Sequence, residues 1–150
     1  MLRFFLACAL LLPHLASAGT AINPASCLRI ATGYGPDDMH VQSLAAPRLI
    51  ISSHDRRNFR SHGNIYSLPI DSLKASIMAR SGEPDGFALR PHGLDLIQRD
   101  GRWWLYVINH DKELFSDQHT LVIYEVSGDT LVFQQELQSP LLTAPNDVAV

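Results

Sequence analysis

The pair Asp100-Gly101 constrains the fold of this chain more than any other feature, because it separates two apolar runs at the spacing of a tight hairpin. Residues 93–97 form the run before it, and residues 103–108 form the run after it. Asp-Gly is favoured in two-residue type I′ turns, where both central residues have positive φ and match the twist of paired strands. The sequence therefore predicts an antiparallel hairpin here.

This turn also predicts which residues face one another. Counting outward from Asp100 and Gly101 places His92 opposite Asn109 and His110 opposite Pro91, so both histidines reach the open end of the hairpin. In strict register their side chains point to opposite faces of the sheet. A site shared by the two histidines therefore requires a β-bulge or a bend at that end.

Short apolar runs of strand length recur along the rest of the chain and are bounded by Gly, Pro, Asp and Ser about every ten residues, a pattern typical of an antiparallel all-β fold. These runs are residues 28–31, 39–44, 48–51, 64–70, 120–126, 130–137 and 147–150. Only residues 71–80 suggest a helix, a short one capped by Asp71 or Ser72. The sequence predicts an all-β protein.

Consecutive hairpins are predicted around the first one. Ser127-Gly128-Asp129 joins two apolar runs, and residues 48–53 and 64–70 frame another pairing across a polar, basic loop. Such four-stranded antiparallel meanders are typical of β-propeller blades. A β-sandwich accommodates the same strands, and the strand pattern alone does not separate the two.

The N-terminus has the pattern of a secretory signal peptide. A basic residue, Arg3, precedes an apolar stretch at 4–12, which is too short to span a bilayer comfortably, and Ala16-Ser17-Ala18 supplies the small residues of a cleavage site. We expect residues 1–18 to be removed, no transmembrane anchor to remain, and the protein to be secreted or periplasmic. The 132 residues that remain, 19–150, suffice for one domain.

Charge and cysteine content narrow the class of partner. The formal net charge moves from −3 to −4 when Arg3 is removed, and the sequence has no basic patch of the kind that binds nucleic acid.

Cleavage of the signal peptide would also leave Cys27 as the remaining cysteine. In an exported protein such a residue is either buried and free or paired with a cysteine outside this sequence.

Two carboxylate-bearing pairs stand before apolar runs and are candidates for a metal site. They are Asp37-Asp38 and Asn146-Asp147. Carboxylate and amide oxygens suit calcium better than zinc. Strand alternation sends Asp37 and Asp38 to opposite sides, which would favour two different ions.

Each of these pairs has a structural interpretation that competes with the functional one. Asp before a strand and Asn-Asp are common turn residues, and Arg56, Arg57 and Arg60 have the pattern of a solvated loop. His54 and His119 have no partner that the sequence indicates. The chain has no Gly-x-Ser-x-Gly motif, and Cys27 has no histidine motif beside it. These patterns argue against a nucleophilic side chain, so a metal and a water are the expected agents of any catalysis.

Four phrases in order, GPDDMHV, RPHGLDL, YVINH and APNDVAV, resemble the paraoxonase/arylesterase family, and the segment HTLVIYEVSGDTLVFQQELQSPLL resembles the family's stretch between its second histidine and its Asn-Asp pair. The similarity spans residues 27–150. The resemblance implies a six-bladed β-propeller with two calcium ions in its central channel. Gluconolactonase-like and strictosidine-synthase-like propellers share the Pro-Asn-Asp phrase.

The resemblance also implies a role for each matched residue. Asp37, where the family has Glu, and Asn146 would bind a catalytic calcium. Asp38, Asp147 and the backbone carbonyl of Leu94 would bind a structural calcium. His92 would be the general base acting on water and His110 its proton-relay partner, while Cys27 would be one half of a terminal disulfide.

The length of the chain and the roles implied for its residues lead to one expected fold and activity. Six blades of about 45 residues need about 270 residues, so we expect residues 19–150 to be the N-terminal, incomplete part of a propeller, with about two to three blades. The expected activity is calcium-dependent hydrolysis of a small-molecule lactone or aryl ester. The alternative is a non-catalytic, calcium-stabilised β-propeller that binds a partner.

Overall fold

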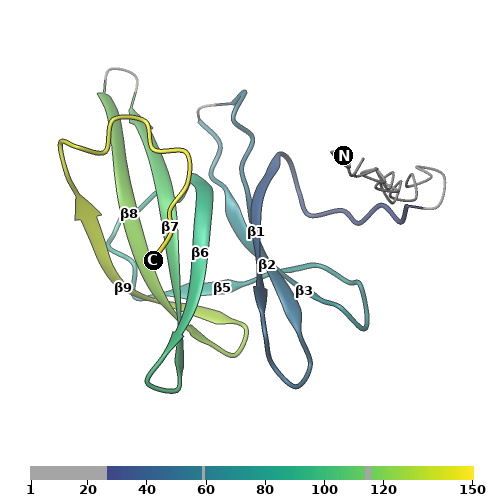
Figure 1. Ribbon diagram of the computed structural model, residues 1–150. Coiled ribbons are helices and arrows are strands. Elements are labelled where there is room, and N and C mark those ends of the chain that lie inside the picture. The colour runs from purple at the N-terminus through teal and green to yellow at the C-terminus, as the bar shows by residue number, and fades with distance from the viewer. Residues whose placement is uncertain (1–26, 59, 114–115) are drawn as a thin grey trace, which may run out of the picture.

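The computed structural model describes residues 27–58, 60–113 and 116–150, which form an all-β structure (Figure 1). The proposed signal peptide, residues 1–18, lies outside the described part of the chain. Nine strands are present in these residues: β1 (Pro36–Gln42), β2 (Arg48–Ser53), β3 (Asn64–Pro69), β4 (Ser76–Ile77), β5 (Ala79–Ser81), β6 (Pro91–Arg99), β7 (Arg102–Glu113), β8 (Ser116–Ser127) and β9 (Thr130–Gln138). Over the same residues, no helical segment has the length and hydrophobicity that crossing a bilayer requires.

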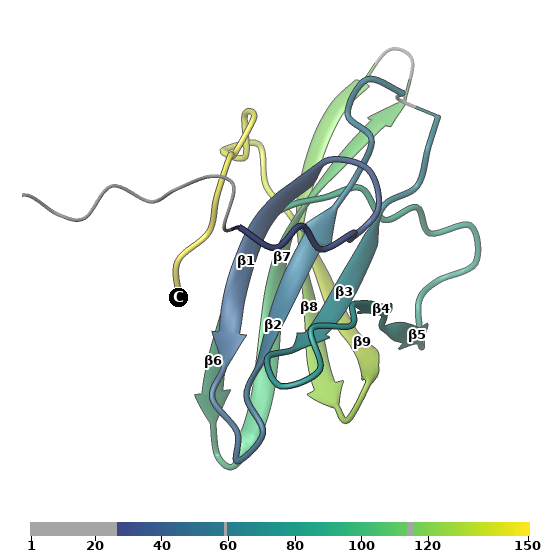
Figure 2. The ribbon, with the colours of Figure 1, turned by 90° about the vertical axis from the view of Figure 1, so that its right-hand side faces the viewer.

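The strands form two sheets, with β1 to β4 in the first and β5 to β9 in the second. The first sheet is an antiparallel meander, β1-β2-β3-β4, and the second has the order β5-β9-β8-β7-β6, with β5 parallel to β9 and the other pairs antiparallel. Seen from the side, the first sheet lies against the second (Figure 2). The predicted pairing of 48–53 with 64–70 is confirmed as β2 and β3.

Both predicted hairpin turns are confirmed. Asp100 and Gly101 have φ values of 53° and 73°, as a type I′ turn requires, and Arg99 pairs with Arg102. Ser127 pairs with Thr130, so Gly128-Asp129 is the two-residue turn of the second hairpin. Local turn chemistry was sufficient to place both.

The core fills the space between the two sheets. Ile50 and Ile65 of the first sheet join one cluster with residues of the second sheet, among them Leu105, Val122 and Leu131. Arg48 adds a polar link at the β8-β9 turn, where its guanidinium donates to the Gly128 carbonyl at 2.6 Å and to Asp129 at 2.5 Å. The sheets are therefore joined by apolar packing and by one buried cation.

Three of the predicted elements are wrong. Residues 71–80 form no helix, because Leu73 has a φ of 54° and Met78, 2% exposed, packs in the core between β4 and β5. Backbone bonds to both sheets, Met78 N–H to Ile65 and Ala79 N–H to Asp129, replace helical ones. Residues 28–31 and 147–150 are not strands. At residue 150 the backbone N–H donates instead to the Asp95 side chain of β6, at 2.8 Å.

Candidate functional site

A β-bulge in β1 brings two candidate ligands together. Pro36 pairs with Ser53 and Met39 pairs with Ile51, so Asp37 and Asp38 together oppose a single residue, Ser52. Both aspartates line the same cavity, which has a volume of about 250 Å³. The prediction that alternation separates them is wrong, because the extra residue interrupts the alternation.

A second bulge, in β6, brings the two histidines together. The predicted register holds from Leu94 to Arg99, but Pro91 rather than His92 pairs with Asn109. His92 and Gly93 therefore oppose a single residue, and the predicted pairing is wrong by one position beyond the bulge. The His92 and His110 rings lie with centroids 4.6 Å apart. The bulge that a shared site requires is thus present.

The segment that follows β9 completes the cavity beside β1 and β6. Asn146 and Asp147 line it together with the two aspartates, Arg56, His92 and Gly93. A Cβ on Gly93 would lie 2.5 Å from Cα of Asp147 and 2.6 Å from the carbonyl oxygen of Asn146. Residue 93 must therefore be glycine for this segment to rest on β6. We call this space the acidic cavity.

The carboxylates of the acidic cavity are held by specific donors. Asp38 accepts the backbone N–H of Leu94 at 2.8 Å and that of Met39 at 2.7 Å, and Asp147 accepts the N–H of Val148 at 2.8 Å. Asp37 contacts Nδ1 of His92 with one oxygen and accepts from Arg56 at 3.1 Å with the other. Three carboxylates thus share the cavity with one arginine.

The donor chemistry of this cavity fits calcium. Carboxylate and amide oxygens predominate, and the excess of negative charge favours a hard cation. Across the described ranges, however, no three His, Cys, Asp or Glu side chains are close enough to form a ready metal-binding group. Binding would require the side chains to draw together around the ion. Leu94 is adjacent, and its N–H is the group that contacts Asp38.

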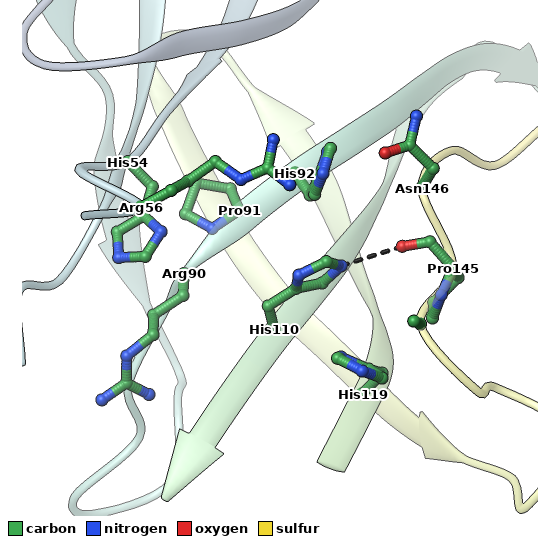
Figure 3. Close-up of a pocket in the computed structure, with 10 residues that line it drawn as sticks. His54, Arg56, Arg90, Pro91, His92, His110, His119, Pro145 and Asn146 are labelled. Atoms are coloured by element: carbon green, nitrogen blue, oxygen red, sulfur yellow. Dashed lines mark hydrogen bonds between the residues drawn. The ribbon is translucent and has the colours of Figure 1, made fainter. Parts of the chain in front are cut away.

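A larger cavity of about 460 Å³ adjoins the acidic cavity (Figure 3). We call it the histidine cavity, because four imidazoles line it. Its walls are His54, Arg56, Arg90, Pro91, His92, His110, His119, Ala144, Pro145 and Asn146. Arg56, His92 and Asn146 line both cavities. A ligand in the histidine cavity therefore lies next to any cation in the acidic cavity.

His92 and His110 are neutral near pH 7, because burial lowers the pKa of each. Burial lowers the pKa of His110 to about 4, and the neighbouring His92, His119 and Arg56 contribute in the same direction. Burial also lowers the pKa of His92, although Asp37 opposes this shift. A neutral imidazole has one nitrogen free to accept a proton, as a general base requires.

Hydrogen bonds assign the proton on His110. Its Nε2 lies 2.8 Å from the carbonyl oxygen of Pro145, and because a carbonyl only accepts, Nε2 carries the hydrogen.

Asn109, next to His110 in β7, has a structural role. Its side chain accepts from the Arg90 N–H at 2.7 Å and donates to the Ala88 carbonyl at 3.2 Å, which holds the chain leading into β6.

Three residues of the site were missed by sequence reasoning. His119 pairs with His110 across β7 and β8, with ring centroids 4.5 Å apart. His54 is buried, with Nε2 3.1 Å from the Ser61 carbonyl. Arg56 lies in an exposed loop, as expected, but it also contacts Asp37 and lines both cavities. Aligning the runs that form β7 and β8 as an antiparallel pair would have placed His119 opposite His110, and this was the one signal that could have identified it.

No protein-family model matches this sequence, and no curated protein matches it significantly. The resemblance to the paraoxonase/arylesterase family accordingly depends on the motifs and their order. The geometry of the two cavities is an independent basis on which a function can be argued.

Proposed function

We propose that this protein is a calcium-dependent hydrolase of lactones or aryl esters, of paraoxonase type. The observation that carries the proposal is the junction of the two cavities. Arg56, His92 and Asn146 line both the acidic cavity and the histidine cavity. A carbonyl bound in the histidine cavity would lie beside the cation-binding oxygens and a neutral imidazole at once.

The oxygens proposed to hold calcium come from three segments of the chain. Asp38 lies on β1, Asn146 and Asp147 follow β9, and the Leu94 carbonyl lies on β6. The family resemblance supports two ions, with Asp37 and Asn146 on the catalytic one. When bound, calcium would polarise the substrate carbonyl as a Lewis acid. Asp37 would have to exchange its contact with Arg56 or His92 to become a ligand.

His92 is the proposed general base. Its Nδ1 faces the Asp37 carboxylate, which favours the tautomer with the hydrogen on that nitrogen and leaves Nε2 to accept. Nε2 takes a proton from water while the water oxygen bonds to the carbonyl carbon. When the ester C–O bond breaks, the leaving alkoxide takes up that proton. His110, beside His92, is the proposed relay partner.

The resemblance to the paraoxonase/arylesterase family also underlies the fold and the cellular location that we propose for the whole protein. Two consecutive four-stranded antiparallel series, β1-β2-β3-β4 and β6-β7-β8-β9, support blades of a β-propeller, with β1 in contact with β6. The N-terminal pattern supports export. Cys27, which is exposed, is proposed to pair with a cysteine outside this sequence.

A non-catalytic, calcium-stabilised propeller is the second candidate. The observation that favours it is the row of packed imidazoles, His92, His110 and His119, since rings in contact also stabilise a fold without taking part in chemistry.

Turnover of lactones and aryl esters, with and without a chelator, separates the two candidates. We expect the chelator, His92→Gln and Asn146→Ala each to lower kcat/KM by about 100-fold or more, the range for loss of a catalytic base or metal. His62→Gln, at an exposed histidine that lines neither cavity, is the matched control and should keep full activity. Activity indifferent to the chelator and to both substitutions would sink the proposed mechanism.

A further inference from the structure

The histidine cavity has a one-sided charge. Arg56, Arg90 and four histidines line it, while no Asp or Glu of the described chain does so. The acidic cavity next to it holds three carboxylates. Opposite charges are therefore segregated between two adjoining spaces, and the histidine cavity is the one suited to an anion.

Two histidines that line this cavity have buried nitrogens without protein partners. Within the described chain, Nε2 of His92 and Nδ1 of His119 have no hydrogen-bond partner, and each residue is only 5% exposed. Figure 3 shows these rings on either side of His110, around the same space. Because leaving a buried polar atom unsatisfied costs about 1–3 kcal/mol, a ligand that pairs with these nitrogens would be favoured here. The His92 proton lies on Nδ1, so His119 is the imidazole whose N–H can be given to an anionic ligand.

Arg56 adds a full positive charge at the opening. It is half exposed, and its pairing with Asp37 at 3.1 Å involves Nη1, which leaves other N–H groups of the guanidinium available. An anion at the opening would therefore pair with this guanidinium.

Apart from Asn146, the remaining lining residues are apolar. Pro91, Ala144 and Pro145 line the cavity, whose volume of about 460 Å³ lies in the range of small-molecule sites. The ligand should therefore combine one anionic group with a compact apolar body, as a carboxylic acid with a hydrocarbon or aromatic substituent does.

We propose that the histidine cavity binds a small organic acid through its carboxylate, with the Arg56 guanidinium at the opening and an imidazole N–H of His119 at the inner end. Binding of this kind does not depend on turnover. If the protein hydrolyses esters as proposed above, the same site would receive the acid that hydrolysis releases.

Calorimetric titration of the full chain with benzoate, with excess chelator present, tests the site. Benzoate carries a carboxylate on an apolar ring, and benzamide is its uncharged counterpart. We expect benzoate to bind at least about 10-fold more tightly than benzamide, in keeping with charge-assisted hydrogen bonds. Arg56→Gln should weaken benzoate binding about 10-fold, and His119→Phe, which keeps a ring, about 5-fold or more. Arg57→Gln makes the same charge change one residue away, outside the cavity, and should leave the affinity unchanged.

Several outcomes would overturn the proposal. One is equal affinity for benzoate and benzamide, a comparison that needs no variant. Another is unchanged benzoate affinity in Arg56→Gln. Equal binding of inorganic phosphate would show that charge alone is recognised, without the apolar walls. Benzoate binding that appears only with calcium would assign the carboxylate to the metal instead. Loss of turnover on chelation tests the hydrolase separately, so the two proposals fail independently.

Discussion

At the scale of single residues, neighbouring oxygens decide which nitrogen of each central histidine carries a proton. The Asp37 carboxylate faces Nδ1 of His92, and the Pro145 carbonyl accepts from Nε2 of His110. Burial keeps both rings neutral by lowering their pKa values. The two imidazoles therefore hold complementary tautomers, with Nε2 of one and Nδ1 of the other able to accept.

The lowered pKa of His110 predicts a pH-dependent stability. Its pKa is about 4 in the folded state against 6.5 without the fold, so the unfolded chain binds the proton first as pH falls. The free energy of unfolding should thus be fully retained above pH 6.5 and should fall between pH 6.5 and about 4, by about 2 kcal/mol after allowance for partial exposure. Urea unfolding followed by tryptophan fluorescence at a series of pH values measures this.

Two variants test the assignment of that pH dependence. His110→Gln should flatten the profile over this range, and His62→Gln, at an exposed position, should not. An unaltered slope in His110→Gln would show that the dependence arises elsewhere.

At the scale of elements, the first long strand of each sheet carries a bulge at its entry. In β1 the bulge presents Asp37 and Asp38, and in β6 it presents His92 and Gly93. Because β1 and β6 are in contact, the two irregularities meet at one place. A bulge directs adjacent side chains that a regular strand would send to opposite faces, and this is why both cavities lie there.

Two glycines should respond to alanine for different reasons. At Gly93 a Cβ meets the 146–147 segment at 2.5–2.6 Å, so Gly93→Ala should displace that segment and lower stability by about 1–3 kcal/mol. It should also reduce any stabilisation by calcium, which differential scanning calorimetry with and without the ion would measure.

Gly101→Ala is the matched control for that experiment. Nothing lies within 4 Å of its Cβ position and its φ is 73°, so the cost should be conformational, about 1 kcal/mol. The calcium response should be intact in this variant. Equal calcium responses in the two variants would contradict the role given to the 146–147 segment.

At the scale of the whole molecule, a buried arginine ties one sheet to the other. The Arg48 guanidinium donates to Gln42 at 2.6 Å and to Ser67 at 3.2 Å within its own sheet, and to Gly128 and Asp129 in the β8-β9 turn. The Arg48 side chain is only 9% exposed, so these partners must offset the cost of burying its positive charge. The link lies at the β8-β9 turn and supplements the apolar core between the sheets.

Arg48→Met should lower the free energy of unfolding by about 2–4 kcal/mol, because it leaves two buried acceptors, Gln42 and Ser67, without their donor. Asp129→Asn is the control. The Asp129 side chain is 84% exposed, so its loss of charge should cost under about 1 kcal/mol. Both values come from urea unfolding curves. Equal losses in the two variants would show that the exposed ion pair, and not the buried network, joins the sheets.

The sequence by itself determined the all-β class and both tight hairpins, because Asp-Gly and Gly-Asp turns between apolar runs are set by interactions within a few residues. It also indicated that His92 and His110 would need a bulge to meet. Only the tertiary structure decided where the bulges lie, that residues 71–80 extend between the sheets, and that Arg56 and His119 join the cavities. All three features depend on packing between segments that are distant in sequence. At Met78, Asp37 and Gly93 this packing outweighs the local helix or strand preference of the sequence.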